Sequence, residues 1–112
     1  MSDSSDLIVL VDTINRLNEV PDSRWWIGGE TKEIGDPHRC CGCAIALMNG
    51  LGIKQNYGRI SVYASRRGQS LGLASVNDGC NDRFQQATPK ARTLAYLEWI
   101  KELPLKPVTD YA

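Results

Sequence analysis

Two helix starts of the same kind divide this chain and limit what it can fold into. At Asp36-Pro37 and again at Thr88-Pro89, a residue with a side-chain acceptor precedes a proline, and an apolar segment follows. The acceptor caps backbone N–H groups of the first helical turn, and proline suits the first helical position because its missing N–H is not needed there. The sequence therefore predicts helices over residues 36–49 and 88–103.

The segments between and before these starts also favour helices. Residues 53–69 fit either a strand or a helix, and we favour a helix that ends at Gly68. Residues 70–76 predict a short further helix. Residues 4–19 are expected to form a helix, because apolar residues recur there at the spacing of one buried stripe. The stripe consists of Leu7, Leu10, Val11, Ile14 and Leu17.

These elements predict one mainly α domain over residues 1–112, a compact bundle of about four helices. The first, second and last helices are expected to form its core. Residues 26–27 and 32–34 leave room for one short β-hairpin. Residues 1–5 and 105–112 are expected to be flexible, as chain ends often are.

Charge is unevenly distributed along the chain, although the net charge is zero. Residues 1–36 carry eight acidic and three basic residues, whereas residues 37–112 carry five acidic and ten basic ones. We favour attraction between the two parts within one fold over an acidic face that meets a basic partner. The polar start, the short apolar runs and the adjacent thiols predict a cytoplasmic protein without membrane contact.

The Asp36–Gly50 stretch holds the only histidine and three of the four cysteines. A metal- or thiol-dependent protein is therefore one hypothesis, with zinc as the metal, because zinc favours thiolate and imidazole ligands. The spacing matches poorly, since no second ligand pair follows. A redox or nucleophilic role has less support still, because no strand precedes the motif. We expect no cofactor and interpret the cysteines as packing residues; the alternative ligands are His38, Cys40, Cys43 and Cys80.

Candidate binding residues lie outside that stretch. Trp25 and Trp26 are adjacent, so one is expected to pack on the core and the other to lie at the surface, where tryptophan is a frequent hot-spot residue. Asn77 and Asp78 are interpreted first as structural turn residues, and with Asp82 they form a second candidate surface. A nucleic-acid interface is a further alternative that needs phosphate-contacting cations. Its candidates are Arg59, Arg66 and Arg67, with Tyr57 beside them.

The order of several motifs resembles a family of small uncharacterised proteins of bacteria and their phages. The motifs are Trp26-Ile27-Gly28-Gly29, Cys43-Ala44-Ile45-Ala46-Leu47, Leu73-Ala74-Ser75-Val76-Asn77-Asp78 and a helix from Thr88 to Ile100. The resemblance implies a compact helical fold and brings no known activity or catalytic residues.

Together these observations predict a non-enzymatic protein-binding accessory or inhibitor protein. If it is phage-encoded, its partner is a host factor in the host cytoplasm, such as a defence system. The metal- or thiol-dependent protein and the nucleic-acid-binding protein are the alternatives. A homodimer is compatible with the sequence.

Overall fold

The computed structural model describes residues 3–25 and 44–106 of the chain. Within these residues it has five α-helices, one short 3-10 helix and no strand, which confirms the mainly α prediction. The predicted β-hairpin and the Asp36-Pro37 helix start lie outside the described residues. The elements are α1 (Asp3–Asn18), η1 (Asp22–Arg24), α2 (Ala44–Gly50), α3 (Asn56–Ser65), α4 (Leu73–Asn77) and α5 (Pro89–Glu102).

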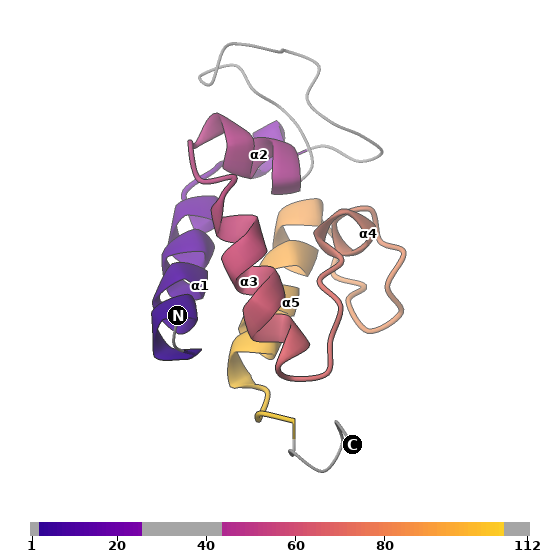
Figure 1. Cartoon of the computed structure of the whole chain (residues 1–112). Coiled ribbons are helices and arrows are strands. Elements are labelled where there is room, and N and C mark those ends of the chain that lie inside the picture. Colours follow the sequence, from indigo (N-terminus) through magenta and orange to yellow (C-terminus); the bar gives the residue numbers. More distant parts are fainter. Residues whose placement is uncertain (1–2, 26–43, 107–112) are drawn as a thin grey trace.

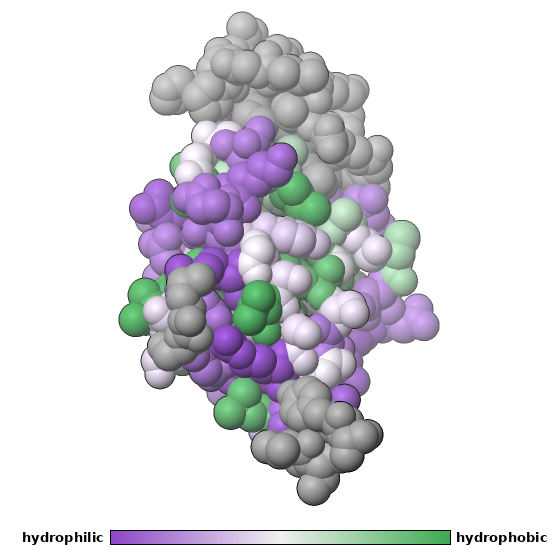
Figure 2. All heavy atoms as spheres, viewed as in Figure 1, coloured by the Kyte–Doolittle hydropathy of each residue, from purple (hydrophilic) through white to green (hydrophobic). Residues whose placement is uncertain are grey.

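Three long helices form the body of the fold. α1 packs against both α3 and α5, while α4 packs on α5 and α2 lies across one end, in contact with α1 and α4 (Figure 1). α3 lies at the front of this view. In the space-filling view of the same face, weakly polar and hydrophobic side chains gather over the middle of the molecule, between hydrophilic ones (Figure 2).

Every α-helix contributes to one hydrophobic core. Removal of these side chains from water is the main favourable contribution to folding. α3, which the sequence left undecided between strand and helix, is a full member of this core. Its contributions are Ile60, Tyr63 and Ala64, and the other fully buried apolar residues include Leu10, Leu17, Met48, Leu73, Val76, Leu97 and Ile100.

The buried stripe of α1 is rotated from the predicted one. Leu10 and Ile14 are buried as predicted, but Val11 is exposed. Thr13 and Asp6 take its place inside the fold. The reason is polar: the hydroxyl oxygen of Thr13 accepts a hydrogen bond from Asn56 of α3 at 3.1 Å, and Asp6 binds arginines of α3. Periodicity of apolar residues could not reveal a helix face that is docked partly through polar groups.

Glycines follow two helices, and the one at position 68 was predicted to end its helix. Gly52 follows α2 with a φ of 76°, and Gly68 follows α3 with a φ of 78°. Positive φ values of this size favour glycine at helix C-termini. Leu51 directly follows the end of α2 at Gly50 and is exposed.

Parts of the two chain ends that were expected to be flexible lie within the described residues. Residues 3–5 form the first turn of α1. The backbone N–H of Lys106 donates a hydrogen bond of 2.9 Å to the carbonyl oxygen of Arg66, at the end of α3. None of the helices in the described ranges is long and apolar enough to cross a membrane.

The start of α5 confirms its predicted cap and provides a direct test. Thr88 Oγ1 accepts a hydrogen bond of 3.1 Å from the backbone N–H of Ala91, and Pro89 occupies the first helical position. Thr88→Ala should lower the free energy of unfolding by about 1 kcal/mol, because that N–H loses its partner. Urea denaturation followed by circular dichroism measures the change. Thr88→Ser keeps the hydroxyl and should remain near wild type; equal stability of both variants would contradict the capping role.

Candidate functional site

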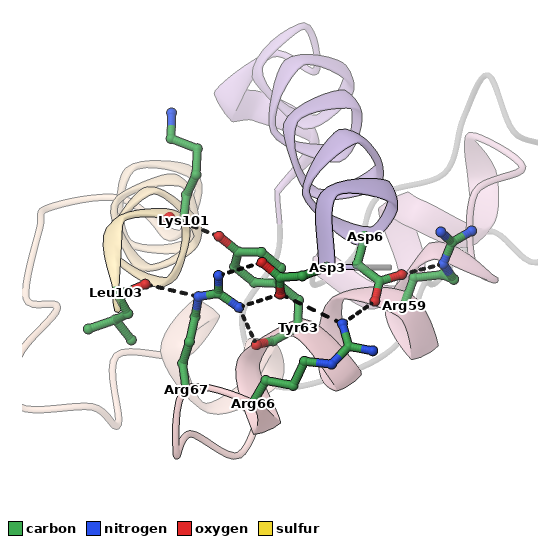
Figure 3. A network of polar contacts seen from close by, with 8 residues as sticks. All are labelled: Asp3, Asp6, Arg59, Tyr63, Arg66, Arg67, Lys101 and Leu103. Atoms are coloured by element: carbon green, nitrogen blue, oxygen red, sulfur yellow. Dashed lines mark hydrogen bonds and ion pairs between the residues drawn. The ribbon is translucent and has the colours of Figure 1, made fainter. Parts of the chain in front are cut away.

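Polar contacts are concentrated where the first turns of α1 meet α3. Asp6 is buried and accepts hydrogen bonds from Arg59 Nε at 2.6 Å and from Arg66 Nη1 at 2.9 Å (Figure 3). Asp3 accepts two from Arg67, at 2.8 and 2.9 Å. The acidic first part of the chain and the basic second part thus attract each other inside one fold, as the charge pattern favoured.

Helix geometry explains why these five side chains meet. Asp3 and Asp6 are three residues apart and therefore lie on one side of α1. Arg59 and Arg66 are seven residues apart, or about two turns, and face the same way. The pairs Asp3–Arg67, Asp6–Arg59 and Thr13–Asn56 run in opposite directions along the two sequences, so α1 and α3 are antiparallel.

Arg67 and Tyr63 extend the network to the end of α5. The Arg67 guanidinium lies 3.4 Å from the centroid of the Tyr63 ring, a cation–π contact. Arg67 Nε donates to the carbonyl oxygen of Leu103, and the Tyr63 hydroxyl donates to that of Lys101, each at 2.9 Å. Burial raises the pKa of Tyr63, so its hydroxyl keeps the proton that it donates.

The arginines lower the pKa of both carboxyl groups. For Asp3 the largest cause is the hydrogen bond from Arg67, and for Asp6 it is the hydrogen bond from Arg59. Burial opposes the shift in each case but does not reverse it. Both groups are therefore ionised at neutral pH, and neither is suited to accept a proton as a general base.

The three arginines do not form an uncompensated basic patch. Arg67 is bound through both terminal nitrogens to Asp3, and its side chain is only 6% exposed. Arg59 and Arg66 share the carboxylate of Asp6. Nucleic-acid binding needs cations that can reach phosphates. The internal pairing therefore weakens the observation on which the nucleic-acid hypothesis was based.

The surface of α3 is hollowed beside the pairs that Asp6 forms with Arg59 and Arg66. One open hollow of about 400 Å³ lies at its cationic end, and a second of about 720 Å³ lies at its first turn. The two hollows share Gln55 and Gly58 and therefore adjoin each other; together they are here called the α3 groove. The first is lined by Asp6, Gln55, Gly58, Arg59, Val62 and Arg66, and the second by Ile45, Lys54, Gln55, Tyr57 and Gly58.

The α3 groove is apolar at one end and positively charged at the other. The side chain of Asp6 is 2% exposed, whereas those of Arg59 and Arg66 are 29% and 34% exposed. The cations therefore reach the surface while their counter-ion lies beneath. At the apolar end the Tyr57 ring is fixed, because its hydroxyl donates a hydrogen bond of 3.2 Å to the carbonyl oxygen of Leu71.

Gly58 forms the floor between the two ends. A Cβ atom placed on it would meet nothing within 4 Å, and its φ is not positive. Neither crowding nor backbone conformation within the described residues explains the absence of a side chain here. A glycine at this place leaves room for another molecule to approach the backbone of α3 closely.

The predicted binding residues do not share one accessible surface. Trp25 is buried, and its indole N–H donates a hydrogen bond of 3.3 Å to the carbonyl oxygen of Val20. It is the tryptophan that packs on the core; Trp26 lies outside the described residues. Asp82 is exposed, but Asn77 is fully buried.

Asn77 and Asp78 contact each other within the fold, at the C-terminal end of α4. The amide nitrogen of Asn77 donates to the Asp78 carboxylate at 3.0 Å. Arg92, buried on α5, donates to the carbonyl oxygens of Val76 and Asn77 at 3.3 and 2.7 Å. These contacts close the C-terminal end of α4 and tie it to α5.

The metal- or thiol-dependent hypothesis depends mainly on residues that the structure does not describe. His38, Cys40 and Cys43 lie outside the described residues. Cys80 is exposed and forms no disulfide with any residue that the structure describes. Within residues 3–25 and 44–106, no group of three or more histidine, cysteine, aspartate or glutamate side chains is arranged to hold a metal ion. The hypothesis therefore stays a prediction.

The burial of Asp6 leads to a stability test. Asp6→Asn should lower the free energy of unfolding by about 2 kcal/mol, because an amide replaces a buried carboxylate that accepts two charge-assisted hydrogen bonds. Asp12→Asn is the matched control: Asp12 pairs with Arg16 on the exposed surface of α1, and such pairs contribute about 0.5 kcal/mol or less. Urea denaturation compares the two. Equal losses would show that burial of the Asp6 pair adds nothing.

The lowered pKa values of Asp3 and Asp6 predict acid sensitivity. The unfolded chain binds protons near the ordinary value of 3.8, whereas the folded chain resists them to lower pH. The stabilisation is therefore complete above that value and is lost as the pH falls through the native pKa values. Unfolding free energies measured across this range should fall more steeply for wild type than for the double variant Asp3→Asn, Asp6→Asn. Parallel curves would contradict the assignment.

Comparisons of the chain with known protein families, with functionally described proteins and with solved structures gave no match. The resemblance to small proteins of bacteria and phages therefore stays a prediction. The function has to be argued from the residues of the α3 groove and from the contacts that hold them.

Proposed function

We propose that this chain is a non-enzymatic protein-binding accessory or inhibitor protein, and that its partner binds in the α3 groove. The observation that supports this most is that an apolar hollow and a cationic hollow adjoin each other at Gln55 and Gly58. Protein interfaces combine these features: an apolar centre that excludes water and a polar margin that fixes orientation. If the chain is phage-encoded, the partner is a host factor such as a component of a defence system.

The groove is held in shape before any partner arrives. Its inner neighbours Ile60, Tyr63 and Ala64 are buried in the core. Two of the groove's own side chains, Tyr57 and Arg59, are fixed by hydrogen bonds to Leu71 and Asp6. A surface that is already ordered loses less conformational entropy when it binds. This rigidity favours a docking surface over a segment that must fold on binding.

The groove's chemistry favours binding over catalysis. Its one carboxyl group, Asp6, is buried, ionised and bonded to two arginines. Among the described residues that line the groove there is no histidine, cysteine or serine that could act as a nucleophile or a proton carrier. Arginine and tyrosine, which do line it, are enriched in the energetically important parts of protein interfaces.

The proposal moves the interface away from the tryptophan pair. Trp25 was a candidate because tryptophan is frequent in binding hot spots, but its burial against Val20 gives it a role in the core. The α3 groove takes over as the binding surface. Its exposed apolar residue is Val62, which lies between Arg59 and Arg66 on the same side of the helix.

Gly58→Ala separates stability from binding. The added methyl group should raise the free energy of unfolding by about 0.5 kcal/mol, because alanine restricts the unfolded chain and meets no neighbour in the fold. It should nevertheless weaken partner binding, because it fills the floor of the groove. Urea denaturation measures the first effect. Loss of binding together with loss of stability would contradict this explanation.

Site-specific photocrosslinking tests the proposed interface. A benzophenone side chain placed at Val62 should give a discrete protein adduct in lysate of the natural host cell, and Gly58→Ala should reduce that adduct. The control position is Asn15, which is exposed on α1. An adduct of equal yield from both positions, or the absence of a discrete adduct from Val62, would refute the α3 groove as the interface.

A further inference from the structure

We infer that Arg59 binds a side-chain carboxylate of the partner, and that the partner segment in the α3 groove is an acidic amphipathic helix. This inference rests on the protein-binding function proposed above. It adds the chemistry of the segment that binds: one carboxylate for the cationic end of the groove, and apolar side chains for the other end.

The orientation of Arg59 is the first reason. Asp6 Oδ1 accepts a hydrogen bond from its Nε at 2.6 Å, and this is the hydrogen bond that Arg59 makes within the described part of the chain. Its two terminal nitrogens point away from Asp6 (Figure 3). A guanidinium held in this way presents two parallel donors, the arrangement that binds both oxygens of a carboxylate.

The depth of Asp6 is the second reason. Its side chain is 2% exposed, compared with 29% for Arg59 and 34% for Arg66, so the groove surface is cationic although an anion lies below it. Lys54 adds a further exposed cation at the other end. A partner that covers these groups removes them from water, which is costly unless it supplies an opposite charge. A carboxylate meets that requirement.

The apolar end gives the rest of the partner's pattern. Ile45 and the fixed ring of Tyr57 line the larger hollow, and Val62 is exposed in the smaller one. From Arg59 to Val62 the helix rises by about 4.5 Å, which is somewhat less than one turn. Acidic and apolar side chains three or four residues apart on a partner helix match this separation. Gly58, directly before Arg59, allows the backbone of that helix to come close.

A phosphate chain fits the groove less well than a peptide. Nucleic acids bind through several cations in a row, and here the buried Asp6 already neutralises one of the two arginines that share it. The apolar hollow beside Tyr57 has no counterpart in a phosphate backbone. Binding of nucleic acid is therefore measured in the same test, and tighter binding of nucleic acid than of the peptide would overturn the inference.

Synthetic peptides provide the test. The first probe is a capped helical peptide of about four turns with leucine and glutamate at helical spacing on one face. The second has glutamine in place of every glutamate, and the third is a short single-stranded oligonucleotide. Each is labelled and titrated with the full chain by fluorescence anisotropy, and backbone amide shifts of residues 55–66 show by NMR whether it contacts the groove. The acidic peptide should bind at least about tenfold more tightly than the glutamine peptide.

Variants of Arg59 test the residue itself. Arg59→Ala should weaken the acidic peptide about tenfold, and Arg59→Lys should recover only part of this loss, because lysine keeps the charge but not the paired donors. Arg16→Ala is the matched control, since Arg16 pairs with Asp12 on the exposed side of α1. Circular dichroism verifies that each variant is folded.

The contrary outcomes are distinct. If both peptides shift residues 55–66 equally, the groove binds protein segments but the carboxylate inference is wrong. If neither peptide contacts the groove, the inference fails, and an adduct from the Val62 crosslinking experiment then decides whether protein binding also fails. Tighter binding of the oligonucleotide, or unchanged binding of the acidic peptide by Arg59→Ala, would also overturn it.

Discussion

The buried carboxylate of Asp6 is the interaction on which the arrangement of α1 and α3 depends. A charge removed from water is very unfavourable unless hydrogen-bonding partners of opposite charge surround it. Arg59 and Arg66 supply those partners from α3, and Asp3 and Arg67 extend the pairing toward α5. α1 cannot rotate or slide along α3 without exposing or unpairing Asp6. The ion pairs therefore fix the position of α1 relative to α3. The apolar contacts between the two helices would by themselves allow several relative positions.

Features that depend on neighbouring residues were predictable from the sequence. The Thr88 cap, the glycine at position 68 after α3 and the turn around Asn77 each follow from local hydrogen bonding or backbone conformation. The buried side of α1 was not predictable from the sequence, because Asp6 pairs with Arg59, which lies 53 residues away in the sequence. A pattern rule assigns an aspartate to the solvent. The excess of acidic residues before position 37 was the available signal, and it indicated internal attraction without naming the pair.

The candidate site shows the same division. The arginines of the α3 groove were identified from the sequence, but they were assigned to phosphate contacts. The sequence shows the cations and does not show which carboxylates pair with them in the fold. Gly58 gave no sequence signal at all: its importance is visible only when the space above it is seen to be open. Trp25 was identified as a candidate by its residue type. Of two adjacent tryptophans one was expected to be buried, but the sequence does not show which, so the burial of Trp25 against Val20 was not predictable.

Asp6 links the stability of the fold to the proposed binding. The same carboxylate that docks α1 on α3 also sets the orientation in which Arg59 reaches the groove. Asp3 and Arg67 stabilise the same helices but do not line the groove, and the side chain of Arg67 is only 6% exposed. Loss of Asp6 would therefore disturb both the helix packing and the binding residue, whereas loss of Asp3 would affect the packing alone. If the groove is the working surface, its cationic end belongs to the most constrained part of the fold, and a partner meets an arginine whose orientation was set during folding.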